Sequence, residues 1–232
     1  MYRRALEGTE KAVGPEHTST LETVNNLGGL YAEQGKMAEA EAMYRRALEG
    51  KEKAWGPEHT STLDTVNNLG VLCNDQGKMA EAEAMYRRAL EGYEKARGPE
   101  HTSTLATVNN LGVLYAEQGK MAEAEAMYRR ALEGYEKAWG PRHTSTLHTV
   151  NNLGILYKDQ GRMAEAEAMV RRALDGKEKR GGRSTRRRFT RSTIWGFFTK
   201  IKARWPKRKP WFDGRWTATR IVGAGAHDDS SH

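Results

Sequence analysis

The sequence predicts an all-α solenoid in which antiparallel helix hairpins repeat with a period of 42 residues. The string MYRRALEG begins at residues 1, 43, 85 and 127, and a variant, MVRRALDG, begins at residue 169. Within each copy the apolar residues recur at helical spacing. A fixed period of this length is typical of a supersecondary unit that stacks on copies of itself.

Each copy contains two predicted helices, helix A and helix B. In the first complete copy, helix A has one apolar face, formed by Leu21, Val24, Leu27, Leu30 and Tyr31. Thr18, Ser19 and Thr20 precede this face, and Ser19 with Glu22 fits a capping box, which predicts the start of the helix. Gly35 predicts its end.

Helix B shows the same kind of spacing, at Met37, Ala40, Met43, Tyr44, Ala47 and Leu48. It is expected to run to about Ala54, before Gly56-Pro57 ends it. Small residues would let the two helices approach closely: Gly28 in helix A, and Ala40 and Ala47 in helix B. One hairpin cannot bury its own apolar stripe, so neighbouring hairpins must stack.

The period divides the chain into six segments. We expect an orphan helix B at 1–13, four hairpins at 18–55, 60–97, 102–139 and 144–179, and a basic tail of different composition at 180–232. Met1 aligns with an internal Met of helix B, so the sequence starts within a repeat. We therefore expect a fragment of a longer gene.

The repeat resembles the tetratricopeptide repeat (TPR). Seven residues match the TPR signature W-x2-L-G-x2-Y…A-x3-F-x2-A, namely Val24, Leu27, Gly28, Tyr31, Ala40, Tyr44 and Ala47. Val24 replaces the usual Trp, and Glu52 stands where that family often has Pro. The motif TVNNLGxLYxxQGK is similar to that of kinesin-light-chain-type TPRs, which are abundant at the C-terminal end of fungal NOD-like receptors. The resemblance covers 1–179 and implies partner binding without naming the partner.

The four copies of helix A differ at a few positions, and in TPR folds the matching positions line the concave groove. The resemblance therefore implies groove residues Glu22, Asp64, His148, Glu33, Asp75, Glu117, Lys158 and Asp159. Their carboxylates favour a basic or neutral ligand, either a protein or an extended peptide.

Two adjacent asparagines recur in every helix A: Asn25 and Asn26, Asn67 and Asn68, Asn109 and Asn110, and Asn151 and Asn152. An Asn amide offers donors and an acceptor. In similar TPR proteins such residues bond the backbone of a bound peptide, and variable side chains beside them supply specificity. The alternative is that one Asn of each pair bonds within the helix stack, and the sequence does not decide between the two.

No residue pattern in the repeats indicates catalysis, and we expect neither an enzyme nor a cofactor. His17, His59, His101 and His143 recur once per repeat, which favours loop or cap roles over a metal site. Glu39 and Glu41 are expected on a solvated face. Cys73 takes the place of Tyr31, so we expect it to pack in the core.

Composition places the charge of the chain in its tail. The net charge is +8, but 180–232 hold 14 Lys and Arg against 3 Asp and Glu. A single Cys, no membrane-spanning apolar run and no signal-peptide core favour a cytoplasmic protein without a membrane partner. Apolar faces at both ends of the array would allow end-to-end self-association.

The tail spells the repeat again when its codons are read in a shifted frame. Plausible codons from Gly181 onward give GPEHTSTLHT and then VNNLGILYKDQGKMAEAEAMVRRALDGYE, and the four Trp residues of the tail leave no freedom in their codons. We hypothesise a frameshifted fifth repeat, which sequencing of the locus tests. Specific nucleic-acid binding is then not expected. The alternatives are nucleic-acid or anionic-membrane binding by the tail, or a gene fragment without function of its own.

Overall fold

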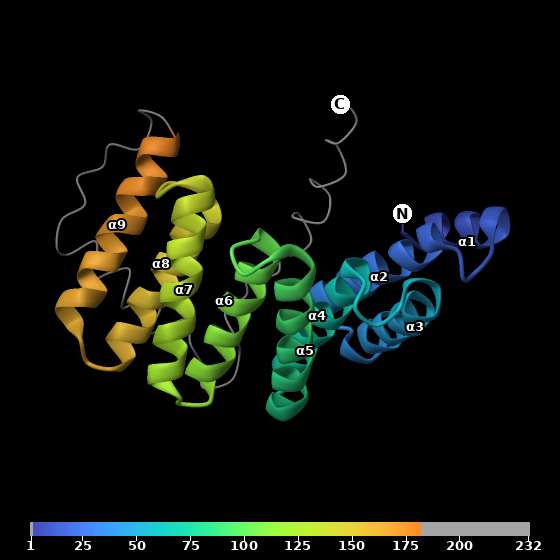
Figure 1. Cartoon of the computed structure of the whole chain (residues 1–232), viewed down its shortest axis with the longest axis horizontal. Coiled ribbons are helices and arrows are strands. Elements are labelled where there is room, and N and C mark those ends of the chain that lie inside the picture. Colours follow the sequence, from blue (N-terminus) through green and yellow to red (C-terminus); the bar gives the residue numbers. More distant parts are fainter. Residues whose placement is uncertain (1, 182–232) are drawn as a thin grey trace. The chain divides into compact units, whose positions relative to one another are not determined.

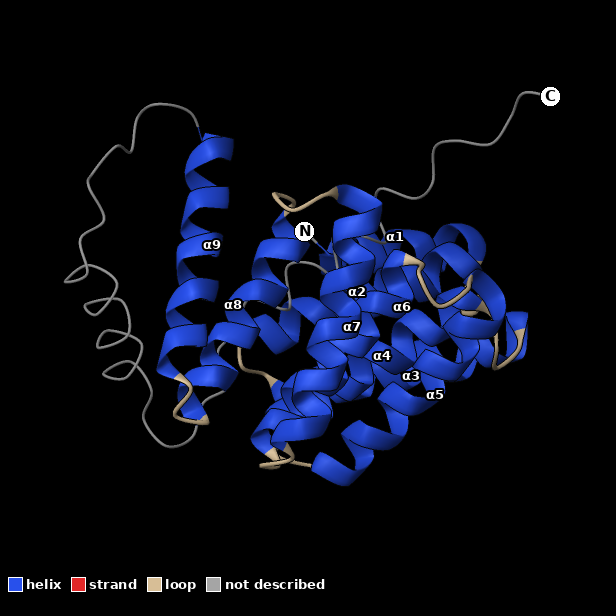
Figure 2. Cartoon of the chain, turned by 60° about the vertical axis from the view of Figure 1, so that its left-hand side comes forward, coloured by secondary structure: helices blue, strands red, loops and turns tan. Residues whose placement is uncertain are grey.

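The structure is a computed structural model that describes residues 2–181 and the side chains of 4–177. This part of the chain contains helices and no strand (Figures 1 and 2). The helices are α1 (Tyr2–Val13), α2 (Thr18–Glu33), α3 (Met37–Trp55), α4 (Thr60–Asp75), α5 (Met79–Arg97), α6 (Thr102–Glu117), α7 (Met121–Trp139), α8 (Thr144–Asp159) and α9 (Met163–Gly181). The predicted all-α repeat fold is confirmed. Residues 182–232, which hold the shifted-frame repeat, lie outside the described residues.

The described residues form two compact units that divide within α6, between Thr107 and Val108. In the first unit, α2 pairs with α3 and α4 pairs with α5, while α3 also packs on α4 and α1 on α2. In the second unit, α8 pairs with α9 and packs on α7. Helix A of one repeat therefore contacts both its own helix B and the helix B before it.

A histidine caps the N-terminus of each helix A. The Nδ1 atom of His17 accepts a hydrogen bond from the Ser19 backbone N–H at 3.3 Å, and His59, His101 and His143 repeat this contact. The predicted cap role of the histidines is confirmed. The capping box of Ser19 with Glu22 is wrong, because the cap residue lies two positions earlier.

The turn from helix A to helix B depends on one glycine. Gly35 has φ of 74°, a conformation that residues with a Cβ rarely adopt. The next N–H, of Lys36, donates to the Tyr31 carbonyl at 2.9 Å, which satisfies one of the last carbonyls of α2. The predicted helix end at Gly35 is confirmed.

The core lies between helices A and B of each hairpin. In the first hairpin Leu21, Val24, Ala40 and Ala47 are buried. A Cβ on Gly28 would lie only 2.9 Å from the ring of Tyr44, so glycine is what lets this ring pack on helix A. The predicted role of small residues is confirmed.

Candidate functional site

The first asparagines Asn25, Asn67 and Asn109 face the next repeat. The Oδ1 atom of Asn25 accepts from the Nδ2 of Asn68 at 3.3 Å, and that of Asn109 accepts from Asn152 at the same distance. Asn67 and Asn109 are buried. Their Oδ1 atoms also accept hydroxyl bonds from the threonines of the following helix A, Thr107 and Thr149, at 3.1 and 3.2 Å. These first asparagines therefore hold successive repeats together.

The second asparagine lies on a different stripe of helix A. In α2 the stripe runs through Glu22, Asn26, Gly29 and Glu33, which are spaced by four, three and four residues and so share one face. None of these residues is buried. Equivalent residues are Asp64, Asn68, Val71 and Asp75 in α4, and His148, Asn152, Ile155 and Asp159 in α8. Asn110 and Glu117 occupy it in α6.

Bonding between repeats leaves part of the second asparagine unused. Asn68 and Asn152 each donate from Nδ2 to the preceding repeat, which fixes the orientation of the amide. Their Oδ1 atoms are not engaged by that bond. In the pair Asn67 and Asn68 both amides therefore bond between repeats, and the Oδ1 atom of Asn68 is an acceptor that this bonding leaves on the stripe.

The acidic residues of the stripe differ in solvent exposure and in hydrogen bonding. Glu22 and Glu33 are exposed. Asp64 accepts a hydrogen bond from the hydroxyl of Tyr93 in its own hairpin, and burial raises the pKa of its carboxyl. Lys51 is 2% exposed, donates from Nζ to the Ser61 carbonyl at 3.1 Å, and has its pKa lowered by burial. Asp64 therefore stabilises the hairpin as well as contributing charge.

The second unit presents a mixed charge on the same stripe. His148 replaces the acidic residue on the stripe, and Lys158, one position beside the stripe, forms a 3.0 Å ion pair with Asp159. Because these two adjacent side chains form an ion pair, their charges neutralise each other. Among the asparagines expected from the resemblance, Asn26 and Asn151 have no side-chain hydrogen-bond partner among the described residues.

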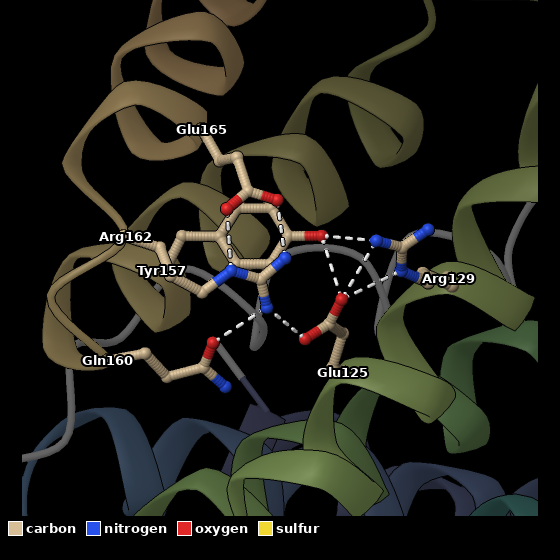
Figure 3. A network of polar contacts seen from close by, with 6 residues as sticks. All are labelled: Glu125, Arg129, Tyr157, Gln160, Arg162 and Glu165. Atoms are coloured by element: carbon tan, nitrogen blue, oxygen red, sulfur yellow. Dashed lines mark hydrogen bonds and ion pairs between the residues drawn. The ribbon is translucent and has the colours of Figure 1, made fainter.

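A polar network in the second unit was not predicted from the sequence (Figure 3). Glu125 of α7 accepts bonds from Arg129, from the hydroxyl of Tyr157 and, at 2.6 Å, from Arg162 of the next repeat. The Arg162 guanidinium lies 4.1 Å from the centre of the Tyr157 ring and also bonds Glu165. Burial opposes ionisation of Glu125, but these hydrogen bonds outweigh it and lower the pKa of its carboxyl.

The first unit has the counterpart of this network around Glu41. Arg45, Gln76 and Lys78 donate to its carboxylate, and these bonds lower the pKa of Glu41 to about 2. The expectation that Glu41 lies on a solvated face is therefore wrong, although Glu39 is exposed as expected. The carboxylate joins two repeats. Cys73 is buried as predicted and replaces the tyrosine of the network.

Two kinds of site are absent from the described residues. No cluster of His, Cys, Asp or Glu in residues 4–177 has the arrangement of a metal site. None of the described helices is both long and apolar enough to cross a membrane.

Comparison with known proteins identifies the family. The tetratricopeptide repeat model matches residues 1–53, 61–137 and 106–179, so the chain belongs to the tetratricopeptide repeat family. TPR proteins typically mediate protein–protein interactions, and the family is a scaffold rather than a catalytic one. No curated protein matches the sequence significantly.

Solved structures share the fold. BtubC (BKLC) from P. vanneervenii is 28% identical with a TM-score of 0.67, covering 82% of this chain and 75% of that protein. A putative kinesin light chain from Podosopora anserina, with nearly identical TPR-like repeats, is 22% identical with a TM-score of 0.61, covering 78% and 86%. MamA is 19% identical with a TM-score of 0.53, covering 78% and 89%. The kinesin-light-chain likeness of the repeats is thus supported by structure.

Proposed function

We propose that this chain is a partner-binding module that holds an extended segment of another protein along the open stripe of its A helices. The observation that carries the proposal is the second asparagine of each pair. Asn68 and Asn152 are held in one orientation by the preceding repeat, with Oδ1 left to accept a backbone N–H. These two oriented amides would contact the backbone of a peptide without reading its side chains.

Specificity would come from the residues beside the asparagines. Gly29, Val71 and Ile155 give the stripe a different volume in each repeat, and Glu22 and Glu33 give the α2 copy an exposed negative charge. These charges support a basic or neutral ligand for the first unit. The paired Lys158 and Asp159 support a less charge-selective stripe on α8.

Two variants that break the same internal bond test this role. Peptides selected from a random display library on the full chain serve as the probe. Asn68→Ala removes the stripe acceptor and the bond to Asn25, whereas Asn25→Ala removes that bond but keeps Asn68 on the stripe. We expect Asn68→Ala to weaken peptide binding about tenfold, in line with a lost hydrogen bond of about 1.5 kcal/mol. Asn25→Ala should weaken binding clearly less, because the acceptor of Asn68 stays on the stripe although the bond that orients it is lost. Equal losses for both variants would rule out the stripe as the site.

We further propose an evolutionary origin and a cellular location for the protein. The repeat wording supports derivation from a fungal receptor of the NOD-like type and a cytoplasmic location. The competing nucleic-acid or membrane function depends on residues 182–232, outside the described residues. Truncation after Lys179 separates the two: partner binding persists if the repeats carry it and disappears if the tail does.

A further inference from the structure

One position of helix B carries a lysine in α3 and a tyrosine in the next two copies. The residues are Lys51, Tyr93 and Tyr135, and only 2 to 3% of each is exposed. Tyr93 donates its hydroxyl to Asp64, which belongs to the open stripe. Lys51 therefore brings a buried positive charge to a position beside the stripe that the later copies fill with an uncharged ring.

Lys51 lies between two A helices and forms an ion pair with neither stripe carboxylate. Its Nζ atom donates to the Ser61 carbonyl of α4 at 3.1 Å. Burial lowers the pKa of Lys51, and the charges of Glu22 in α2 and Asp64 in α4 act in the opposite direction. Among the described residues no carboxylate bonds the ammonium directly. Its charge therefore acts through space on both stripe carboxylates.

The charge of Asp64 is compensated by its surroundings. Burial raises the pKa of its carboxyl, while the hydrogen bond from Tyr93 and the charges of Lys51 and Arg97 lower it. Two cations and a hydroxyl donor thus face one buried carboxylate. A ligand on the stripe meets little uncompensated negative charge at this residue.

The other end of the α2 stripe has no such counter-ion. Glu33 is exposed and forms no ion pair among the described residues. Lys36, three positions later, contacts the ring of Tyr31 instead. Asn26 lies four residues after Glu22 and seven before Glu33, which is about 6 Å and about 10 Å along the helix. A segment bound at the level of the asparagines thus has one carboxylate of α2 on each side.

We propose that the bound segment places an uncharged side chain over Glu22 and Asp64 and a lysine or arginine over Glu33, because Lys51 is the internal counter-ion of the first pair. This inference rests on the proposed binding of an extended segment along the stripe. Successive side chains of such a segment point to opposite sides, so one set faces Glu22 and the other faces Glu33. A cation over Glu22 would also lie near Lys51, and their repulsion would offset the attraction. Glu33 offers attraction alone.

A lysine scan of bound peptides tests this assignment. Peptides selected from a random display library on the full chain are synthesised with lysine or norleucine at each position, and fluorescence anisotropy measures their dissociation constants. On the wild-type chain, lysine should strengthen binding about threefold over norleucine on one side of the peptide only. Glu33→Gln should abolish this gain, and Glu22→Gln should leave it in place.

Removal of the buried charge should create a second preference. In Lys51→Met, lysine on the other side of the peptide should strengthen binding about threefold, and Glu22→Gln added to this variant should remove the gain. Lys51→Tyr introduces the residue of the later copies and should give the same second preference, so it replaces Lys51→Met if circular dichroism shows that variant unfolded. Lys53→Met, at an exposed residue of the same helix, should change neither preference.

The outcomes separate this inference from the proposed function. A lysine preference on both sides of the peptide or on neither in the wild-type chain would overturn the role of Lys51. No new preference in the Lys51 variants would do the same, even where Asn68→Ala weakens binding. Equal losses in Asn68→Ala and Asn25→Ala would instead remove the stripe as the binding site.

Discussion

Two glycines at the same position of helix B are expected to respond in opposite ways to a methyl group. Gly8 and Gly50 both follow the sequence MYRRALE. A Cβ on Gly8 would meet nothing within 4 Å. A Cβ on Gly50 would lie 2.4 and 2.9 Å from the two methyl carbons of Leu21, which is only 1% exposed. Because Leu21 is buried, a Cβ on Gly50 requires either the leucine side chain or the α2–α3 contact to shift.

The difference between the two variants isolates this clash. Alanine gains about 1 kcal/mol over glycine inside a helix, and this gain is shared by both positions. Overpacking a well-packed core costs about 1–3 kcal/mol. We expect Gly8→Ala to leave the chain as stable or to raise its stability by up to about 1 kcal/mol, and Gly50→Ala to be less stable than Gly8→Ala by about 1–3 kcal/mol.

Urea unfolding followed by far-ultraviolet circular dichroism measures the pair, with hydrogen exchange of the α1 amides as a local readout for Gly8→Ala. Gly92→Ala is the internal replicate, because its Cβ would lie 2.5 Å from Leu63. If Gly50→Ala and Gly92→Ala proved at least as stable as Gly8→Ala, the close approach of helix B to the leucine of helix A would be refuted.

Three further changes test the contacts between and within repeats. Cys73→Tyr should raise the unfolding free energy by about 1–2 kcal/mol by restoring the aromatic side chain that Tyr157 provides, and a lower urea midpoint would contradict this. The pKa of Glu41 is lowered from 4.5 to about 2, so its ionisation stabilises the fold fully above pH 4.5 and this contribution is lost as the pH falls towards 2. Glu41→Gln should flatten the acid limb of a urea-midpoint-against-pH curve. Burial lowers the pKa of His101, so its protonation below pH 6.5 opposes folding, and His101→Asn should keep the cap while removing that part of the acid sensitivity, measured in the same titration.

The repeat and its hairpins could be predicted because they depend on local pattern. Helical spacing and turn glycines such as Gly35 act within one copy, and the copies confirm one another. Two cap candidates were predicted for helix A, a histidine and a capping box at Ser19, and the histidine is the one that caps it. Ser and Thr are favoured N-caps, but a neutral histidine also presents an acceptor, and His17 lies two residues before the N–H that it caps. The recurrence of His before each TST segment was the signal that favoured a loop or cap role.

The roles of the two asparagines were also present in the spacing. Asn25 lies four residues after Leu21 and three before Gly28, which are both packed against the hairpin. Asn26 shares its spacing with Glu22 and Gly29 instead. One residue turns the side chain by about 100° around the helix, enough to move it from the contact between repeats to the open stripe. Comparing each asparagine with its own helical neighbours would have separated them.

The network around Glu41 could not be found in this way, because its partners are not on its helix. Gln76 and Lys78 are 35 and 37 positions later, a spacing set by how one hairpin stacks on the next. The same spacing joins Glu125 to Arg162, which are also 37 positions apart, so this contact recurs with the stacking of the hairpins and not with the period of a helix.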